Sequence, residues 1–169
     1  MTKTCTIEYR GRGFWAYDES LAILLYVAAD MAESPEFAND FPPEIVKQWR
    51  VVTFLGGNVG LDLNDVCDDA SRRERFVQLI STCAEELRVM GQVNGDAVRG
   101  WRSLGEEVIW RGGQGDEVAS TMPIVELATA IVEMVQGDLP PPPSGHWWFV
   151  GTADGSRTIA MREGGRLAG

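Results

Sequence analysis

The stretch TCTIEYRGRGFWAYDESLAILL, residues 4–25, decides how the chain begins to fold. The β-rich run Thr4–Tyr9 predicts a short strand. Gly11 and Gly13 follow it, and the apolar run that begins at Leu21 predicts a helix. Strand, glycine turn and helix are the order in which dinucleotide-binding proteins hold a pyrophosphate, so the stretch must first be tested as a phosphate loop.

The side chains after the glycines argue against a phosphate loop. Such a loop needs small residues, because the backbone N–H groups must approach the pyrophosphate. Phe14 and Trp15 occupy that approach, and Asp18 and Glu19 place two negative charges at the expected start of the helix. No second strand with an acidic residue about 20 positions on follows. We therefore interpret the stretch as a glycine turn that directs Phe14 and Trp15 into the core before Asp18 caps the helix.

Two helices are expected in the first third of the chain. The first runs from Asp18 to about Glu33 and is apolar on most sides, which is typical of a central helix. The second begins at Pro43, a residue that is tolerated in a first turn, and its apolar side chains recur at helical spacing as far as Leu55.

Two further helices are expected later in the chain. Ser71 and Glu74 have the spacing of a capping box, and Gly91 ends the helix that follows it. The predicted buried stripe of this third helix is Phe76, Leu79, Ile80, Cys83, Leu87 and Met90. A fourth helix begins near Ser120 and Thr121 and ends at Gly137.

The C-terminal stretch HWWFVGTADGSRTIAMR, residues 146–162, has the pattern of a β-hairpin. Its two β-rich runs, Trp147–Gly151 and Arg157–Arg162, flank Asp154-Gly155. An isolated hairpin is marginal in water, so we expect it to recruit the strand Thr4–Tyr9. The sequence thus predicts an α+β fold, with a mainly helical core and a small antiparallel sheet formed from the N-terminal strand and a C-terminal hairpin.

Length and composition indicate one globular domain over residues 1–169, with Pro140–Pro143 as a stiff connector before the hairpin. No apolar run approaches the roughly 18 residues of a membrane span, and no basic segment with a cleavage site opens the chain. The three cysteines are widely spaced, which fits a reducing compartment better than a disulfide framework. We expect a cytoplasmic protein that does not associate with membranes.

The negative charge is concentrated in one part of the chain. The net charge is −10, and residues 18–69 alone carry eleven acidic and two basic side chains, a net charge of −9. Such a field repels nucleic acid and anionic lipid and attracts basic partners. The alternative is a solvated acidic surface that serves solubility.

Metal and cofactor sites are not predicted. A calcium loop that began at Asp62 would have Cys67 at its sixth position and Arg73 at its twelfth, where glycine and glutamate are needed. The three cysteines and one histidine lack zinc-ligand spacing. A fortuitous ion on the aspartates of this segment stays an alternative; these are Asp62, Asp65, Asp68 and Asp69.

Nucleophilic catalysis is not predicted either, because it needs a nucleophile, a base and a group that orients the base. His146 is the one histidine of the chain, and it stands beside Trp147 at an expected strand start, where a packed or hydrogen-bonded role is favoured. Two carboxylates that converge in space stay possible, so a small carboxylate-dependent hydrolase is one alternative function. A regulatory or scaffold domain that pairs through a sheet edge is another.

The segment GRGFWAYDESLAILLYVAA, residues 11–29, is similar to the openings of small acidic immunity proteins, the antitoxins that bacteria encode beside polymorphic or contact-dependent toxins. In such openings a glycine and aromatic turn leads into an apolar helix. The resemblance implies a non-enzymatic cytoplasmic protein that binds and neutralises one toxin domain. Many such toxins are basic nucleases, and opposite charge accelerates association.

On this hypothesis the partner-binding residues are acidic side chains in loops or helix ends of residues 18–69. They are Glu33, Glu36, Asp40, Glu44, Asp62, Asp65, Asp68 and Asp69. The expected partner is a basic toxin domain, and neither nucleic acid nor a cofactor is expected to bind.

Overall fold

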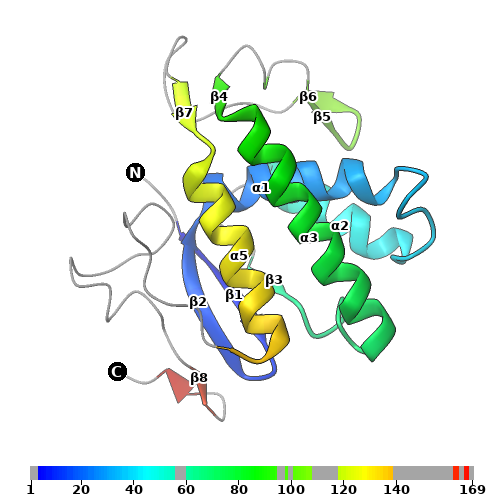
Figure 1. Ribbon diagram of the computed structural model, residues 1–169, viewed down its shortest axis with the longest axis vertical. Coiled ribbons are helices and arrows are strands. Elements are labelled where there is room, and N and C mark those ends of the chain that lie inside the picture. The colour runs from blue at the N-terminus through cyan, green and yellow to red at the C-terminus, as the bar shows by residue number, and fades with distance from the viewer. Residues whose placement is uncertain are drawn as a thin grey trace.

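Figure 1 shows the computed structural model of the chain, in which the described helices enclose most of the core and a small sheet lies to one side of them. The structure describes residues 4–55, 60–94, 98, 101–107, 118–138, 162–163 and 166–167. The helices are α1 (Asp18–Ala32), α2 (Pro43–Leu55), α3 (Ala70–Met90) and α5 (Met122–Gln136). The fold is of the α+β class with a helical core, as the sequence predicted.

The sheet has the strand order β2-β1-β3. Strands β1 (Thr4–Tyr9) and β2 (Arg12–Tyr17) form an antiparallel hairpin, whereas β3 (Leu61–Asp62) pairs with β1 in parallel. The sheet is therefore mixed, and the described partners of β1 are β2 and β3 rather than the expected C-terminal hairpin. Residues 140–161, which include the proline connector, His146, both tryptophans and the predicted turn of that hairpin, lie outside the described residues.

Three short antiparallel pairs accompany this sheet. They are β4 (Gln92–Asn94) with β7 (Val118–Ser120), β5 (Arg102–Ser103) with β6 (Glu106–Glu107), and β8 (Arg162–Glu163) with β9 (Arg166–Leu167). The β4–β7 pair joins the end of α3 to the start of α5. There the buried Thr121 hydroxyl donates a hydrogen bond to the Leu87 carbonyl (2.7 Å), and the Thr121 N–H donates to the Gly91 carbonyl (3.1 Å).

The glycine-rich opening is a hairpin and not a loop before a helix. Arg10 and Gly11 have positive φ angles of 50° and 76°, as in the tight two-residue turns that match the twist of the strands. Phe14 is 1% exposed, but Trp15 is only half-buried, because successive side chains of a strand face opposite sides. The prediction that both aromatic residues enter the core was wrong for Trp15.

Helices α1 and α3 begin differently from the prediction. Helix α1 begins at Asp18 as expected, but Tyr17 is the N-cap, and the Asp18 carboxylate accepts a hydrogen bond from the neighbouring Glu19 N–H (2.9 Å). Helix α3 begins two residues earlier than the expected capping box. Its N-cap is Asp69, whose carboxylate accepts from the Arg72 N–H (2.8 Å). An aspartate is a strong N-cap, and here it takes that role from Ser71.

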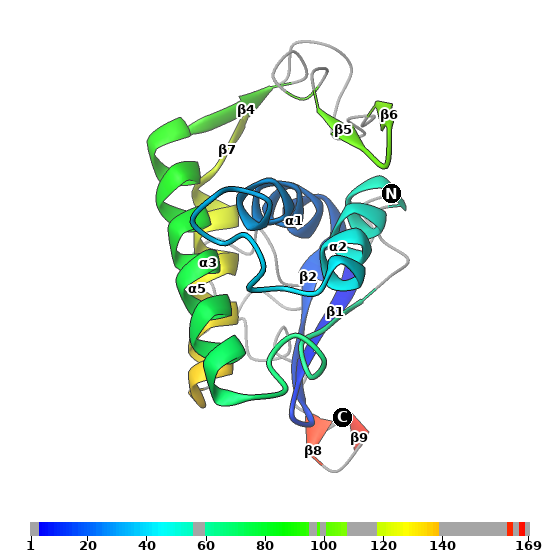
Figure 2. The ribbon, with the colours of Figure 1, turned by 90° about the vertical axis from the view of Figure 1, so that its right-hand side faces the viewer.

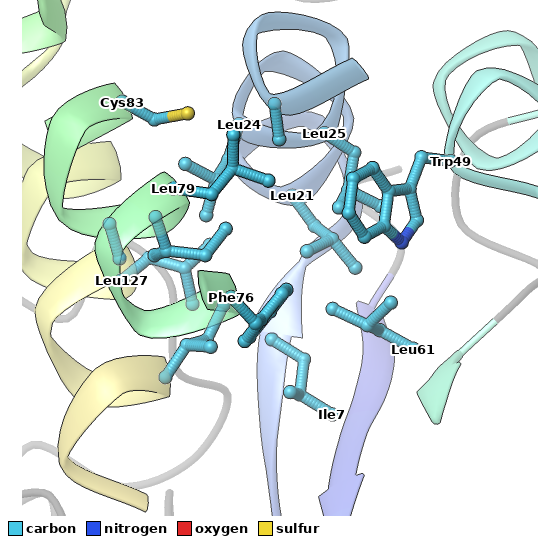
Figure 3. Close-up of a cluster of buried hydrophobic side chains, with 14 of the residues drawn as sticks. Ile7, Leu21, Leu24, Leu25, Trp49, Leu61, Phe76, Leu79, Cys83 and Leu127 are labelled. Atoms are coloured by element: carbon cyan, nitrogen blue, oxygen red, sulfur yellow. The ribbon is translucent and has the colours of Figure 1, made fainter. Parts of the chain in front are cut away.

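Helix α1 lies at the centre of the helical layer, between α2 on one side and the α3–α5 pair on the other (Figure 2). This position explains why α1 is apolar on most sides. Leucines of α1 meet Trp49 of α2, and Phe76 of α3 lies close to Ile7 of β1 (Figure 3). The predicted stripe of α3 is buried up to Leu87, whereas Met90 is 41% exposed because it lies in the last turn of the helix.

The three cysteines are free and buried, each at most 4% exposed, which confirms the expectation that Cys83 belongs to the core. Burial raises the pKa of Cys5, Cys67 and Cys83 to about 12 in each case. At pH 8 the ionised fraction of each thiol is then on the order of one part in ten thousand. Because the thiolate is the reactive form, the folded protein should react very slowly with a disulfide reagent such as DTNB.

We therefore expect three thiols to react with DTNB only after denaturation. Because the folded pKa lies above the unfolded value of 9.0, the thiols stabilise the fold fully below pH 9, and this contribution is lost as the pH rises from 9 towards 12. Urea denaturation at pH 8 and pH 10 measures the loss, which should reach about 1–2 kcal/mol per thiol at pH 10. Rapid reaction of any of the three thiols in the native protein at pH 8 would contradict this burial.

Candidate functional site

The predicted partner-binding residues come from two segments: one runs from the end of α1 through the loop to the first turn of α2, and the other runs from β3 to the start of α3. Both lie on the side that faces the viewer in Figure 2. Arg75 of α3 connects the first segment to the helix. Its Nε and Nη2 atoms donate to Asp40 Oδ2 at 2.8 and 2.5 Å, and Nη2 also donates to the Glu36 carbonyl at 2.8 Å. The Arg75 guanidinium lies 4.8 Å from the ring centre of Phe37, which is fully buried.

Arg72 holds the second segment. Its guanidinium pairs with Asp68 (Nη1–Oδ1, 2.9 Å) and lies 3.9 Å from Asp69, and it donates to the Asp65 carbonyl at 3.3 Å. The hydrogen bond from the Arg72 backbone N–H, followed by the Arg72 charge, lowers the pKa of Asp69. Asp68 and Asp69 are thus engaged by the first turn of α3.

Arg50 of α2 holds the end of α1. Its Nη2 atom donates to Glu33 Oε2 (2.9 Å) and pairs with Asp30, and its side chain is only 11% exposed. Burial by itself would lower the pKa of Arg50, but the hydrogen bonds and charges of Asp30 and Glu33 outweigh it, so that the pKa is raised. The guanidinium also lies 5.3 Å from the ring centre of Tyr26, within cation–π range.

The remaining four predicted residues are exposed and keep uncompensated charge. Asp62 accepts hydrogen bonds from the backbone N–H and the side-chain amide of Asn64 (2.8 and 2.7 Å), both of which are neutral donors. The side chains of Glu36, Glu44 and Asp65 form no ion pair with any described residue. The eight residues therefore divide into four carboxylates that pair with an arginine and four that form no ion pair with a described residue.

A groove of about 720 Å³ lies between the loop that joins α1 to α2, the first turns of α2, and Arg72 at the start of α3. Its charged lining consists of the carboxylates Glu33 and Asp40 and the cations Lys47, Arg50 and Arg72. Each of the two carboxylates is bound by an arginine, Glu33 by Arg50 and Asp40 by Arg75. The groove thus presents both signs of charge and holds no free pair of carboxylates within the described chain.

The sequence interpretation missed the arginines that pair with these carboxylates. Residues 18–75, which add Arg72, Arg73 and Arg75 to the acidic segment, carry twelve acidic and five basic side chains, a net charge of −7. A signal was present in the sequence, because Arg72 stands four positions after Asp68, a spacing that pairs side chains on a helix. The acidic field is therefore weaker than the count over residues 18–69 indicated.

The described residues contain no group of three or more histidine, cysteine, aspartate or glutamate side chains placed to hold a metal ion, and Asp62, Asp65, Asp68 and Asp69 form no such group. Two of these aspartates are instead engaged by Arg72. None of the described helices is both long enough and apolar enough to span a membrane.

Comparisons with models of known protein families, with characterised proteins and with solved structures found no match for the chain. The similarity of residues 11–29 to immunity proteins stays a prediction from the sequence. The functional argument therefore depends on the geometry of the site and on its charge.

Proposed function

We propose that the chain is a binding protein of the immunity type, which neutralises a basic bacterial toxin by occupying its active site or substrate groove. The observation that carries the proposal is that two acidic segments lie on the same side of the molecule (Figure 2), and that their side chains Glu36, Glu44, Asp62 and Asp65 are exposed and form no ion pair with a described residue. A basic nuclease presents the complementary charge at the site that would otherwise bind phosphate.

The arginine pairs support the same proposal in a different way. Arg75 ties the loop that carries Glu36 to α3, and Arg72 ties the segment that carries Asp65 to the first turn of α3. A surface that is ordered before binding loses less conformational entropy when the complex forms. The bound carboxylates therefore position the surface, and the free carboxylates meet the partner.

The proposal predicts binding to the product of the neighbouring gene, measured by pull-down and by stopped-flow association. We expect the double variant Glu44→Gln/Asp65→Asn to reduce the association rate constant about five- to tenfold at low ionic strength. The difference should shrink in 0.5 M salt, because the screening length falls to a few ångströms.

The matched control is Glu133→Gln/Asp138→Asn, which removes the same charge from the end of α5, outside both acidic segments. This control should change the rate constant less than about twofold. Failure of the neighbouring gene product to bind would overturn the proposal. Equal rates for the two double variants would overturn its electrostatic part.

A further inference from the structure

A second pocket, of about 400 Å³, lies between α1 and the C-terminal half of α3. Its volume falls within the range of about 300–1,000 Å³ that is common for ligand sites. Tyr26 and Met31 of α1, Met90 of α3 and Trp101 supply apolar walls, and the pocket is separate from the larger groove described above. Apart from Glu36, none of the predicted partner-binding residues lines it.

The aromatic wall of this pocket is well defined. The Tyr26 and Trp101 rings stack with their centres 4.1 Å apart and their planes inclined by 3°. The backbone N–H of Trp101 donates a hydrogen bond to the Val98 carbonyl (2.8 Å). Val98 is 1% exposed, so the backbone that carries the tryptophan is anchored in the core. Trp101 itself is only half-buried, which leaves part of the indole at the pocket.

The charged lining of the pocket is entirely acidic among the described residues. The carboxylates are those of Asp30, Glu36 and Glu86, and no described lysine, arginine or histidine lines the pocket. Arg50 pairs with Asp30, so the charge of Asp30 is offset. Glu36 and Glu86 are exposed and form no ion pair within the described chain, and they leave the pocket with about two uncompensated negative charges.

An apolar wall beside uncompensated carboxylates matches a side chain with an apolar stem and a cationic end. Arginine fits better than lysine, because its planar guanidinium presents several N–H donors in a fixed geometry and can pair with two carboxylates at once. A neutral or anionic group would leave Glu36 and Glu86 uncompensated.

We infer that the pocket between α1 and α3 binds an arginine side chain of a protein partner, with the guanidinium at Glu36 and Glu86 and the methylene stem along Trp101 and Met90. The inference rests on the proposed function to the extent that the arginine belongs to the basic partner. Interfaces draw much of their affinity from a few anchored side chains. The pocket would supply such an anchor, which the exposed carboxylates of the acidic surface do not.

The test uses the full chain and a small probe, so its outcome does not depend on the identity of the partner. N-acetyl-arginine methylamide is titrated into ¹⁵N-labelled protein, with N-acetyl-citrulline methylamide as the neutral isostere and N-acetyl-lysine methylamide as the second cation. We expect shifts at the Trp101 indole N–H and at the Thr82, Glu86 and Met90 amides with the arginine amide. The citrulline amide should leave these signals unchanged.

The variant Glu36→Gln/Glu86→Gln should raise the dissociation constant of the arginine amide about fivefold. The matched control, Glu85→Gln/Glu133→Gln, removes the same charge outside the pocket; Glu85 neighbours Glu86 on α3 but pairs with Arg88. This control should change the dissociation constant less than twofold.

Three outcomes would overturn the inference. They are shifts of the same size with the citrulline amide, equal effects of the two double variants, and the absence of shifts at the pocket. Tighter binding of the lysine amide would overturn the choice of arginine. Each result is independent of whether the neighbouring gene product binds, so the pocket and the proposed function fail or succeed separately.

Discussion

Replacement of Trp49 by alanine should lower the free energy of unfolding by about 3–5 kcal/mol. Trp49 is 1% exposed, and its ring packs against Phe41 at 5.4 Å and Phe76 at 6.1 Å between ring centres. The substitution removes a large apolar side chain and leaves a cavity between α2 and α3. Phe41 and Phe76 lose the ring against which they pack in the same step.

Urea denaturation followed by circular dichroism measures this change better than fluorescence, because the chain contains six tryptophans. Trp49→Phe should cost less than Trp49→Ala, since it retains an aromatic ring in the same space. Val89→Ala is the control: Val89 is 81% exposed on α3, and its truncation should change stability by no more than about 0.5 kcal/mol. A loss below about 1 kcal/mol for Trp49→Ala would show that the three rings do not form a packed core.

The helices were predictable because their signals are local. Periodic apolar residues placed α1 and α2 within about one residue of their observed bounds, and glycines correctly marked the ends of α3 and α5 at Gly91 and Gly137. Both glycines have positive φ angles, 71° and 108°, which explains why they stop their helices. Exact caps depend on competition between neighbouring residues, and Asp69 prevailed over Ser71.

Strand β2 was missed although its signal was present. Phe14, Trp15 and Tyr17 are typical strand residues, and Arg10-Gly11 separates them from β1 by two residues, the commonest length of a hairpin turn. The second glycine, Gly13, made the segment resemble a loop. The parallel pairing of β3 with β1 had no comparable signal, because it joins Ile7 to Leu61 across more than 50 residues of chain.

In the candidate site, too, contacts between residues close in sequence were predictable, whereas contacts between distant residues were not. The pairing of Asp68 with Arg72 follows from helical spacing, whereas the pairing of Asp40 with Arg75 joins residues 35 positions apart and needs the tertiary fold. The sequence therefore predicted where acidic residues are concentrated but not which of them keep a free charge. The pocket beside Trp101 lay outside the prediction for the same reason, since its walls come from segments that only the fold brings together.

The substitution Gly13→Ala should lower the free energy of unfolding by about 2 kcal/mol. A methyl group at Gly13 would lie 2.7 Å from the Ile7 carbonyl oxygen and 3.1 Å from the Glu8 Cγ atom. The nearer atom belongs to the backbone of the paired strand, so the side chain cannot simply rotate away from it. Strand β1 would have to move, and it is held on its other edge by the pairing of Ile7 with Leu61.

The variant Gly105→Ala is the control. It measures the cost of placing an alanine in a backbone conformation that favours glycine, without a steric clash. Nothing lies within 4 Å of a methyl group at Gly105, and its φ of 84° makes the backbone conformation the only source of strain, worth about 1 kcal/mol. Urea denaturation should show a larger loss for Gly13→Ala than for Gly105→Ala. The opposite order would mean that β1 and β2 separate easily. The expected order would show that a glycine is needed at position 13 because β1 and β2 approach each other closely there. The glycine then needs no explanation as part of a phosphate-binding loop.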